Sequence, residues 1–289
     1  MQFMVVDQRH RRCGLIRLIG LDLDGTLLTR EKKITERTAA ALNRAAERGV
    51  GIVPVTGRPL AGLPAELDGI RGIRYAVTSN GACIYDLSRK VILRETGMEP
   101  RKAMEVLAAA EDLDPIAEIF AGGYGYHTPD TSRRLEERFA GTPVMDYLRR
   151  SRRSMHSLEE FLSHFNGRIE NISLMFSDPA GRNLTCARLE AVSGIRMIHP
   201  WPTDLEITHE AAEKGDALMR LAAILGIAAE DVMAMGDGDN DRSLLERSGL
   251  SVAMGNAAPH ILEIADHVTG DNEHDGVADA VEQFVLQEG

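Results

Sequence analysis

The chain has 289 residues, of which 44% are hydrophobic and 27% charged, a composition that fits a folded protein with a sizeable core rather than a disordered or membrane protein. No apolar stretch approaches the roughly 20 residues that span a bilayer. The net charge of −11 argues against nucleic acid or an anionic membrane as partner, so an anionic substrate would need a local positive site.

Residues 1–14 lack the apolar core of a signal peptide, and we interpret them as a frayed N-terminal tail. Cys13, Cys83 and Cys186 form no cluster with metal-ligand spacing. A sparse, odd number of cysteines fits a reducing compartment, so the predicted location is the cytoplasm.

The N-terminal part alternates apolar runs with a helical pattern. The expected elements are a buried strand at 16–23, a helix capped by Thr35 that runs to about Arg48, a strand at 50–55 and a strand at 75–78. The first strand ends at Asp22 and Asp24, the second at Thr56 and Gly57, and the third at Asn80.

The middle of the chain has a different pattern, in which hairpins mix with helices. The expected elements are a hairpin of 82–86 with 91–95, a helix opened by Pro100, a strand-turn-strand unit at 116–127, and strands at 168–176 and 195–198 around a helix after Pro179. This pattern predicts an α+β unit, residues 84–206, inserted into a core made of residues 15–83 and 207–289.

The C-terminal part returns to the first rhythm. The expected elements are a helix at 214–225, a strand at 231–235, a helix that stops at Gly249, a strand at 250–254, a short helix, a strand at 267–269 and a last helix from Gly276. Alternating strands and helices predict an α/β, Rossmann-like core in which helices cover both faces of a parallel sheet. We expect Met233, Met235 and Met254 in its interior.

Acidic side chains gather at the carboxyl ends of two strands, where open α/β sheets build their sites. Asp22 and Asp24 follow the first strand, and Asp237 and Asp241 follow the strand at 231–235. Such a group is costly without a cation, and Mg²⁺ suits carboxylate oxygens. One carboxylate could then act as nucleophile and another, with a raised pKa, as general acid and base.

Phosphate-binding groups are expected beside these carboxylates. The hydroxyl of Thr56, the N–H of Gly57 and the ammonium of Lys214 at a helix start supply donors and positive charge. A calcium loop at Asp239–Asp241 is rejected, because the alternating ligands and the closing Glu at the twelfth position are missing.

Four segments in chain order resemble the motifs of the haloacid dehalogenase superfamily. They are Asp22-Leu23-Asp24-Gly25-Thr26-Leu27-Leu28, Val55-Thr56-Gly57-Arg58-Pro59, Lys214-Gly215-Asp216-Ala217-Leu218 and Met235-Gly236-Asp237-Gly238-Asp239-Asn240-Asp241. Ser79-Asn80-Gly81-Ala82 and Asp275-Gly276-Val277 narrow the resemblance to the Cof-type hydrolases (subfamily IIB), which carry a C2-type α/β cap between the second and third motifs.

The resemblance implies a magnesium-dependent phosphatase in which Asp22 attacks phosphorus and becomes an aspartyl-phosphate. Asp24 would protonate the leaving oxygen and then activate water. The implied Mg²⁺ ligands are Asp22, the backbone carbonyl of Asp24 and Asp237, with Asp241 ordering the metal shell. Thr56, Gly57 and Lys214 would hold phosphate, with Asn240 nearby and Asn80 near the substrate or the cap hinge.

The cap sequence leaves substrate recognition open. Tyr124, Tyr126 and His127 could reach onto the substrate or pack in a surface hairpin. We interpret Trp201, between two prolines, as a packing anchor at a domain junction. The basic run Arg149, Arg150, Arg152 and Arg153 is either a patch for a polyanionic substrate or, the preferred interpretation, a solvated cap loop.

The expected substrate is a small phosphorylated metabolite, such as a sugar phosphate, by analogy with the family. A phosphomutase of the same superfamily and a non-catalytic metabolite-binding protein are the alternatives. The oligomeric state is not predicted.

Overall fold

The structure is a computed structural model that describes residues 15–287 of the 289 in the chain. The tail predicted for residues 1–14 lies outside this range. The strands are β1 (Leu18–Leu21), β2 (Gly51–Pro54), β3 (Tyr75–Thr78), β4 (Cys83–Asp86), β5 (Val91–Glu95), β6 (Ile116–Ala121), β7 (Tyr124–His127), β8 (Arg152–Ser154), β9 (Asn171–Met175), β10 (Ile195–Ile198), β11 (Asp204–His209), β12 (Val232–Gly236), β13 (Leu250–Ala253) and β14 (His267–Val268).

The helices follow the same order along the chain. They are α1 (Glu36–Glu47), α2 (Pro100–Ala108), α3 (Pro129–Phe139), α4 (Val144–Ser151), α5 (Leu158–His164), α6 (Pro179–Leu189), α7 (Lys214–Ile224), α8 (Arg242–Arg247), α9 (Pro259–Leu262) and α10 (Gly276–Val281), with a π-helical segment at Glu282–Leu286. Within the described chain, no helix combines the length and apolar character needed to cross a bilayer.

The core is a parallel sheet in the order β14-β13-β12-β1-β2, and β3 continues it through a parallel bridge between Val55 and Val77. Alternation along β1 explains why both faces are covered. Ile19 and Leu21 pack into a cluster with residues of α1 and α10. Leu18 packs with α7 on the other face, where Gly20 leaves room for Leu218: a Cβ at Gly20 would lie 2.4 Å from a Leu218 methyl carbon.

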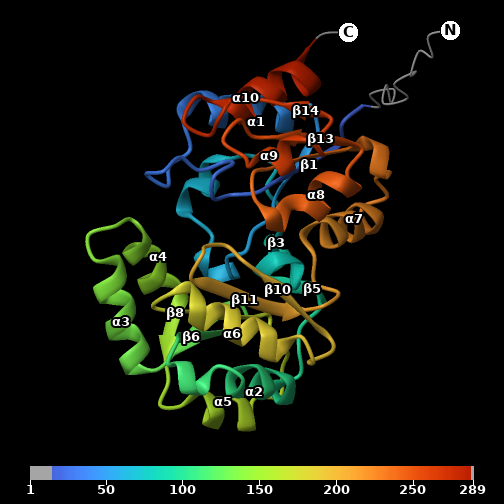
Figure 1. The fold of residues 1–289 in the computed structure, drawn as a ribbon. Coiled ribbons are helices and arrows are strands. Elements are labelled where there is room, and N and C mark those ends of the chain that lie inside the picture. The colour runs from blue at the N-terminus through green and yellow to red at the C-terminus, as the bar shows by residue number, and fades with distance from the viewer. Residues whose placement is uncertain (1–14, 288–289) are drawn as a thin grey trace, which may run out of the picture.

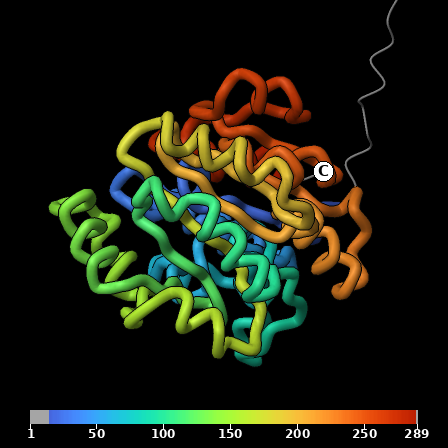
Figure 2. Tube along the Cα trace, turned by 60° about the horizontal axis from the view of Figure 1, so that its bottom comes forward, coloured from blue at the N-terminus to red at the C-terminus, as the bar shows by residue number. Residues whose placement is uncertain are grey.

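The second sheet has the order β10-β11-β9-β6-β7-β8 and lies below the core in Figure 1. Its strands alternate between a fully apolar face and a polar one. Ile119, Ile172, Leu174 and Leu205 belong to the apolar cluster that packs against α2, α5 and α6, the helices that come forward in Figure 2. We refer to this sheet with α2 to α6 as the cap; its polar face is directed at the core.

These findings confirm the predicted α/β architecture with a separate cap sheet. The boundaries at residues 84 and 207 remain predictions. Strand pairing adds that β4 and β5 form an antiparallel sheet with β3, and that β11 pairs in the second sheet as far as His209. The Thr35 cap of α1 is present, because its hydroxyl oxygen accepts the Thr38 N–H at 3.1 Å. Met233, Met235 and Met254 are buried as expected.

The predicted loop at the basic run is wrong. Arg149 and Arg150 close α4, and Arg152 and Arg153 lie in β8. The Arg152 side chain is only 6% exposed because it pairs with the buried Glu118. The charged composition of the run concealed a strand in which the Arg152 side chain is buried whereas Arg153 and Ser154 are exposed.

Candidate active site

A buried lysine connects two of the predicted carboxylates. The Lys214 ammonium donates to Asp22 Oδ1 and to Asp241 Oδ1, each at 2.7 Å, and all three side chains are at most 7% exposed. Burial by itself lowers the pKa of Lys214, but the two carboxylates reverse the effect and raise it. The local positive charge that the acidic chain required therefore lies between Asp22 and Asp241.

Asp241 also orders the loop that follows β12. Its Oδ2 accepts the backbone N–H groups of Asp237 at 3.0 Å and of Gly238 at 2.9 Å. Gly236 permits this close approach, since a Cβ there would lie 2.5 Å from the Cβ of Asp241. Asp241 thus has both oxygens engaged and fixes where Asp237 points.

Asp237 is held by neutral donors rather than by a cation. Its Oδ1 accepts from the Thr26 hydroxyl at 3.1 Å and its Oδ2 from the Asn256 amide at 3.3 Å. Burial and then the Asp241 charge raise the pKa of Asp237 to about 6. Burial and Asp241 likewise raise the pKa of Asp22 well above its ordinary value, although Lys214 opposes the shift.

The residues fit a hard divalent cation. Carboxylate oxygens of Asp22, Asp237 and Asp241 lie within 4.8 Å of one another. The pKa values of Asp22 and Asp237 are raised first by burial and then by the charge of Asp241, and a cation would relieve that repulsion. Gly25, with φ +88°, leaves this space free: a Cβ would lie 2.3 Å from Asp237 Oδ2. The Asp24 carboxylate is not in this group, so only its backbone carbonyl remains a candidate ligand.

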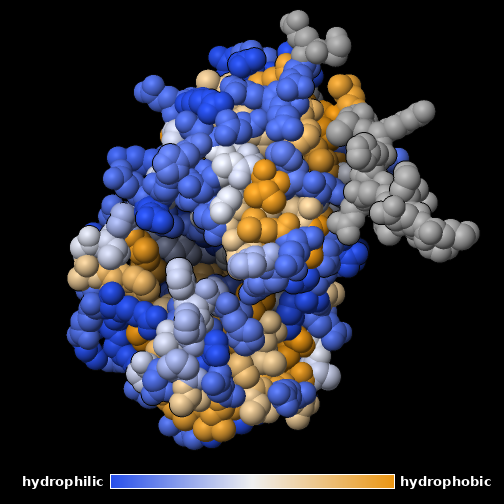
Figure 3. Space-filling model, turned by 45° about the horizontal axis from the view of Figure 1, so that its top comes forward, coloured by the Kyte–Doolittle hydropathy of each residue, from blue (hydrophilic) through white to orange (hydrophobic). Residues whose placement is uncertain are grey.

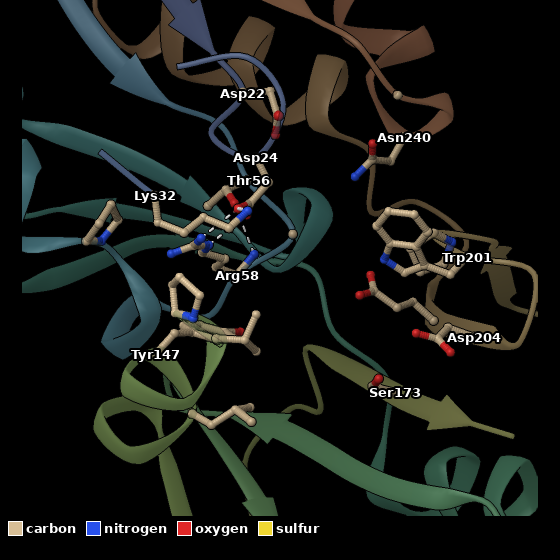
Figure 4. Close-up of a pocket in the computed structure, with 18 of the residues that line it drawn as sticks. Asp22, Asp24, Lys32, Thr56, Arg58, Tyr147, Ser173, Trp201, Asp204 and Asn240 are labelled. Carbon is tan, nitrogen blue, oxygen red and sulfur yellow. Dashed lines mark hydrogen bonds and ion pairs between the residues drawn. The ribbon is translucent and has the colours of Figure 1, made fainter. Parts of the chain in front are cut away.

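Asp24 is clamped by two cations. Arg58 donates through Nε to Oδ2 at 2.7 Å and through Nη2 to Oδ1 at 2.6 Å, and Lys32 donates to Oδ1 at 2.8 Å. Figure 4 shows these contacts as dashed lines. Burial would raise the pKa of Asp24, but the bonds and charges of Arg58 and Lys32 lower it to about 2. The expectation of a raised pKa at the proton-carrying carboxylate is therefore wrong for Asp24 in this state.

Thr56 and Gly57 lie beside Asp22 and line the same cavity as expected. Thr56 is buried, and its hydroxyl oxygen accepts the Arg58 N–H at 3.1 Å, which leaves the hydroxyl proton free to donate. Gly57 is close-packed on Asn80, because a Cβ would lie 3.1 Å from the Asn80 side-chain oxygen. Both residues come from the end of β2, next to β1 in the sheet.

Asn80 connects the core to the cap. Its amide nitrogen donates to Glu206 Oε2 of β11 at 2.5 Å, and its amide oxygen accepts from Asn240 at 3.1 Å. Ser79 and Asn80 both have positive φ, +49° and +55°, and the buried Glu170 accepts the Ser79 hydroxyl at 2.6 Å. Asn80 and Asn240 therefore contact each other where the core meets the cap.

A cavity of about 780 Å³ opens between the core and the cap. The core side contributes Asp22, Asp24, Thr56 and Arg58, and the cap side contributes Glu118, Phe120, Tyr147, Arg152, Ser173, Glu206 and Trp201. Figure 4 shows Asp22 and Ser173 at opposite sides of this space. Figure 3 shows a hollow on one face of the molecule, with both hydrophilic and hydrophobic residues around it.

Of the cap residues singled out from the sequence, some pack within the cap and one lines the cavity. Tyr126 stacks on Phe161, Arg153 lies over the Tyr124 ring, and His127 contacts the buried Glu118, so these three pack within the cap and do not line the cavity. Trp201 is 68% exposed and lines the cavity, so its interpretation as a packing anchor is wrong.

Several residues in and around the site were missed by sequence reasoning. Arg58 stood inside a quoted motif, and its charge next to the phosphate donors was a usable signal. Asn256 follows the strand at 250–254, so its strand-end position was another. Glu206, Ser173 and Tyr147 gave no signal in the sequence, because only the folded cap, through β11, β9 and α4, brings them to the cavity.

The family model of haloacid dehalogenase-like hydrolases matches residues 19–281. The chain therefore belongs to this family, and the resemblance noted in its motifs is confirmed. Phosphatase YwpJ of Bacillus subtilis (strain 168) is 31% identical over 280 residues, which cover 91% of this chain and 98% of that protein. The 5-amino-6-(5-phospho-D-ribitylamino)uracil phosphatase YcsE of the same organism is 29% identical over 94% of this chain and 96% of its own.

Comparison with solved structures agrees with this family assignment. A haloacid dehalogenase-like hydrolase from B. subtilis superposes with a TM-score of 0.81 at 28% identity, covering 92% of this chain and 99% of that one. A subclass IIB sugar phosphatase superposes with a TM-score of 0.77 over 94% and 100% of the two chains; at 24% identity it supports the fold alone. The protein is thus a Cof-type member of the haloacid dehalogenase superfamily and an enzyme of the phosphatase class.

Proposed function

We propose that the protein hydrolyses a small phosphorylated metabolite, with Mg²⁺ as cofactor and Asp22 as nucleophile. One observation carries the proposal: Asp22 lines a cavity of about 780 Å³, is paired with Lys214 and lies next to two further carboxylates. A cavity of this size matches a metabolite rather than a macromolecule.

In the first step, an Asp22 oxygen forms a bond to phosphorus while the bond from phosphorus to the ester oxygen breaks. Protonated Asp24 gives its proton to the departing alcohol. In the second step, Asp24 accepts a proton from water as that water attacks the aspartyl-phosphate, which releases inorganic phosphate and restores Asp22. Thr56, the Gly57 N–H and Lys214 hold the phosphoryl oxygens.

Asp22, Asp237 and the carbonyl of Asp24 would hold the cation, with Asp241 ordering the loop. The bound cation would supply charge neutralisation for the phosphoryl oxygens and the carboxylates. Because Arg58 and Lys32 keep the pKa of Asp24 near 2, Asp24 must exchange at least one of these partners before it can carry a proton.

The relatives support a small substrate. YcsE is named for a ribitylaminouracil phosphate, and YbhA of Escherichia coli (strain K12), 27% identical, is named a pyridoxal phosphate phosphatase. We therefore propose that the substrate is a monophosphate of sugar or vitamin-precursor size and that the enzyme acts in the cytoplasm.

The test is phosphate release with and without Mg²⁺ over a panel of phosphorylated metabolites. Asp22→Asn should lower turnover by at least about 1,000-fold, because the nucleophile is lost. Asp146→Asn is the matched control: this carboxylate lines the same cavity but its side chain is 82% exposed. Appreciable turnover by folded D22N would refute the covalent step. Release of phosphate without added sugar bisphosphate separates hydrolysis from the phosphomutase alternative.

A further inference from the structure

The polar face of the cap sheet forms the floor of the cavity opposite Asp22. Register places one residue from each of three neighbouring strands in a row across this face. Glu206 of β11 pairs with Ser173 of β9, and Ser173 pairs with Glu118 of β6. All three line the cavity. Because side chains alternate along a strand, this row is presented to whatever part of a ligand extends away from the phosphate site.

The carboxylates on this floor are not equivalent. Glu118 accepts Arg152 Nε at 2.8 Å and Nη2 at 3.0 Å, so both of its oxygens are engaged. Asp204 is paired with Arg138 at 2.9 Å and accepts from the Thr203 hydroxyl at 2.8 Å. Each is neutralised by an arginine of the cap.

Glu206 has no such partner. Its Oε2 accepts the Asn80 amide, whereas within residues 15–287 no hydrogen bond reaches its Oε1, and no arginine or lysine forms an ion pair with it. Burial raises the pKa of Glu206, although the Asn80 amide, the more distant Lys214 charge and the neighbouring Asn171 side chain oppose the shift. An acceptor that is largely removed from water and only half engaged favours a donor from a ligand.

A second polar residue lies close to Glu206 in the sheet. Asn171 is 1% exposed, and neither its amide nitrogen nor its amide oxygen has a hydrogen-bond partner in the described chain. Asn171 stands two residues before Ser173 on β9, and Ser173 pairs with Glu206, so Asn171 lies diagonally from Glu206 on the same sheet face, where its side chain acts on the Glu206 carboxylate. Asn171 is buried and does not line the cavity, so the contact with a ligand is left to Glu206 and Ser173.

One wall of the same space is flat and apolar. Trp201 is 68% exposed and lines the cavity, and Figure 4 shows it on the side of Asp204 and Asn240, above the sheet floor. An exposed indole beside acceptors suits a ligand with an apolar face and donors along its edge.

We propose that Glu206, with the Ser173 hydroxyl beside it, binds a hydrogen-bond donor at the end of the substrate remote from the phosphate, while Trp201 packs on its apolar face. The donor is a hydroxyl or an amine. This inference rests on the proposed function and narrows its substrate class to monophosphates with a polar, donor-bearing body. Glu206 is a specificity residue here, and it takes no part in the bond to phosphorus.

The test compares p-nitrophenyl phosphate, whose ring carries no such donor, with ribose 5-phosphate and glucosamine 6-phosphate. Glu206→Leu should lower kcat/KM for the donor-bearing esters by about 10- to 100-fold, mainly through KM, and change p-nitrophenyl phosphate by less than about 3-fold. Glu206→Gln keeps an oxygen for Asn80 and for a hydroxyl. E206Q should therefore nearly restore kcat/KM for ribose 5-phosphate, which offers only hydroxyls. It should not restore kcat/KM for glucosamine 6-phosphate where the ammonium binds to Glu206, because a neutral amide lacks the charge.

Asp146→Asn serves again as the control, and calorimetry provides a readout independent of turnover. Affinity for the two sugar esters should fall in E206L while affinity for inorganic phosphate is unchanged. Equal losses on all three esters, or no loss on any, would overturn the role of Glu206. If wild type releases no phosphate from any ester, the proposed function fails, and the calorimetric comparison still decides whether Glu206 selects the ligand.

Discussion

The Arg152–Glu118 pair allows a quantitative prediction for the cap. Arg152 and Glu118 are 6% and 0% exposed, and two hydrogen bonds of 2.8 and 3.0 Å join them. The Arg152 guanidinium also lies over the rings of Phe120 and Tyr147, at 4.7 and 4.6 Å. Arg152→Met keeps the length and much of the packing volume of the side chain but leaves Glu118 without its counter-charge.

The expected loss of stability follows from the pKa of Glu118. Burial would raise this pKa, but Arg152 and His127 hold it at about 2 against an ordinary value of 4.5. Without Arg152 the buried carboxyl becomes protonated. Protonating a group of pKa 4.5 at pH 7 costs about 3.4 kcal/mol, since each unit is worth about 1.36 kcal/mol. With the lost bonds and ring contacts, the penalty should be about 3–5 kcal/mol, the usual range for breaking a buried pair.

Urea unfolding followed by circular dichroism and tryptophan fluorescence measures this change, because Trp201 is the one tryptophan and lies in the cap-side loop. Arg149→Gln, whose side chain is 68% exposed, is the control and should change stability by less than about 0.5 kcal/mol. The double variant E118L/R152M should recover much of the loss, since no charge is left buried. If R152M is as stable as R149Q, the charge argument is wrong.

The pH dependence checks the same reasoning. Because the folded pKa of Glu118 is depressed, its contribution is present above about pH 4.5 and is lost as pH falls toward about 2. In R152M the cost of protonating Glu118 shrinks as pH falls from 7 to about 4.5, so the difference in stability between wild type and R152M should narrow from pH 7 downward and continue to narrow toward about pH 2. A difference that stays constant from pH 7 to pH 3 would show that packing, not charge, sets the penalty.

Two further changes address the catalytic end of the cavity. Lys214→Met removes the ammonium that donates to Asp22 and Asp241, each at 2.7 Å, so phosphate release should fall by at least about 100-fold. Because the two carboxylates then lack a counter-charge, Mg²⁺ should raise the melting temperature of K214M more than that of wild type. An equal Mg²⁺ effect on both proteins would contradict this. Gly25→Ala places a Cβ 2.3 Å from Asp237 Oδ2 at a residue with φ +88°. This substitution should lower the free energy of unfolding by about 1 kcal/mol or more and weaken the activation by Mg²⁺. Gly69→Ala is the control, because its Cβ would meet nothing within 4 Å, and it should leave the activation by Mg²⁺ unchanged.

The core was predictable because its signals are local. An apolar run followed by acidic or small polar residues marks a buried strand and its carboxyl end, and neighbouring parallel strands bring those ends to one edge. Asp22, Thr56 and Asp237 therefore meet although more than 200 residues separate Asp22 from Asp237. The strand positions near residues 19, 52 and 233 followed from the same pattern.

The cap and the charge state of the site were not predictable in the same way. Arg152 looked like part of a solvated run, yet it is buried because Glu118, 34 residues earlier, lies beside it in the folded sheet. Asp24 was expected to hold a proton, yet Arg58, also 34 residues away, keeps it ionised. In both cases the side chain's environment is set by a distant partner whose position depends on tertiary packing.

Arg58 is the residue at which the two parts of the site meet. It clamps Asp24, donates to the Gly62 carbonyl at 3.2 Å and lies 4.8 Å from the ring centre of Tyr147 on cap helix α4. Releasing Asp24 from the guanidinium therefore also disturbs a contact between core and cap. The chemistry at Asp22 is built into the core, but the state of its proton carrier depends on a residue that both parts of the protein hold in place.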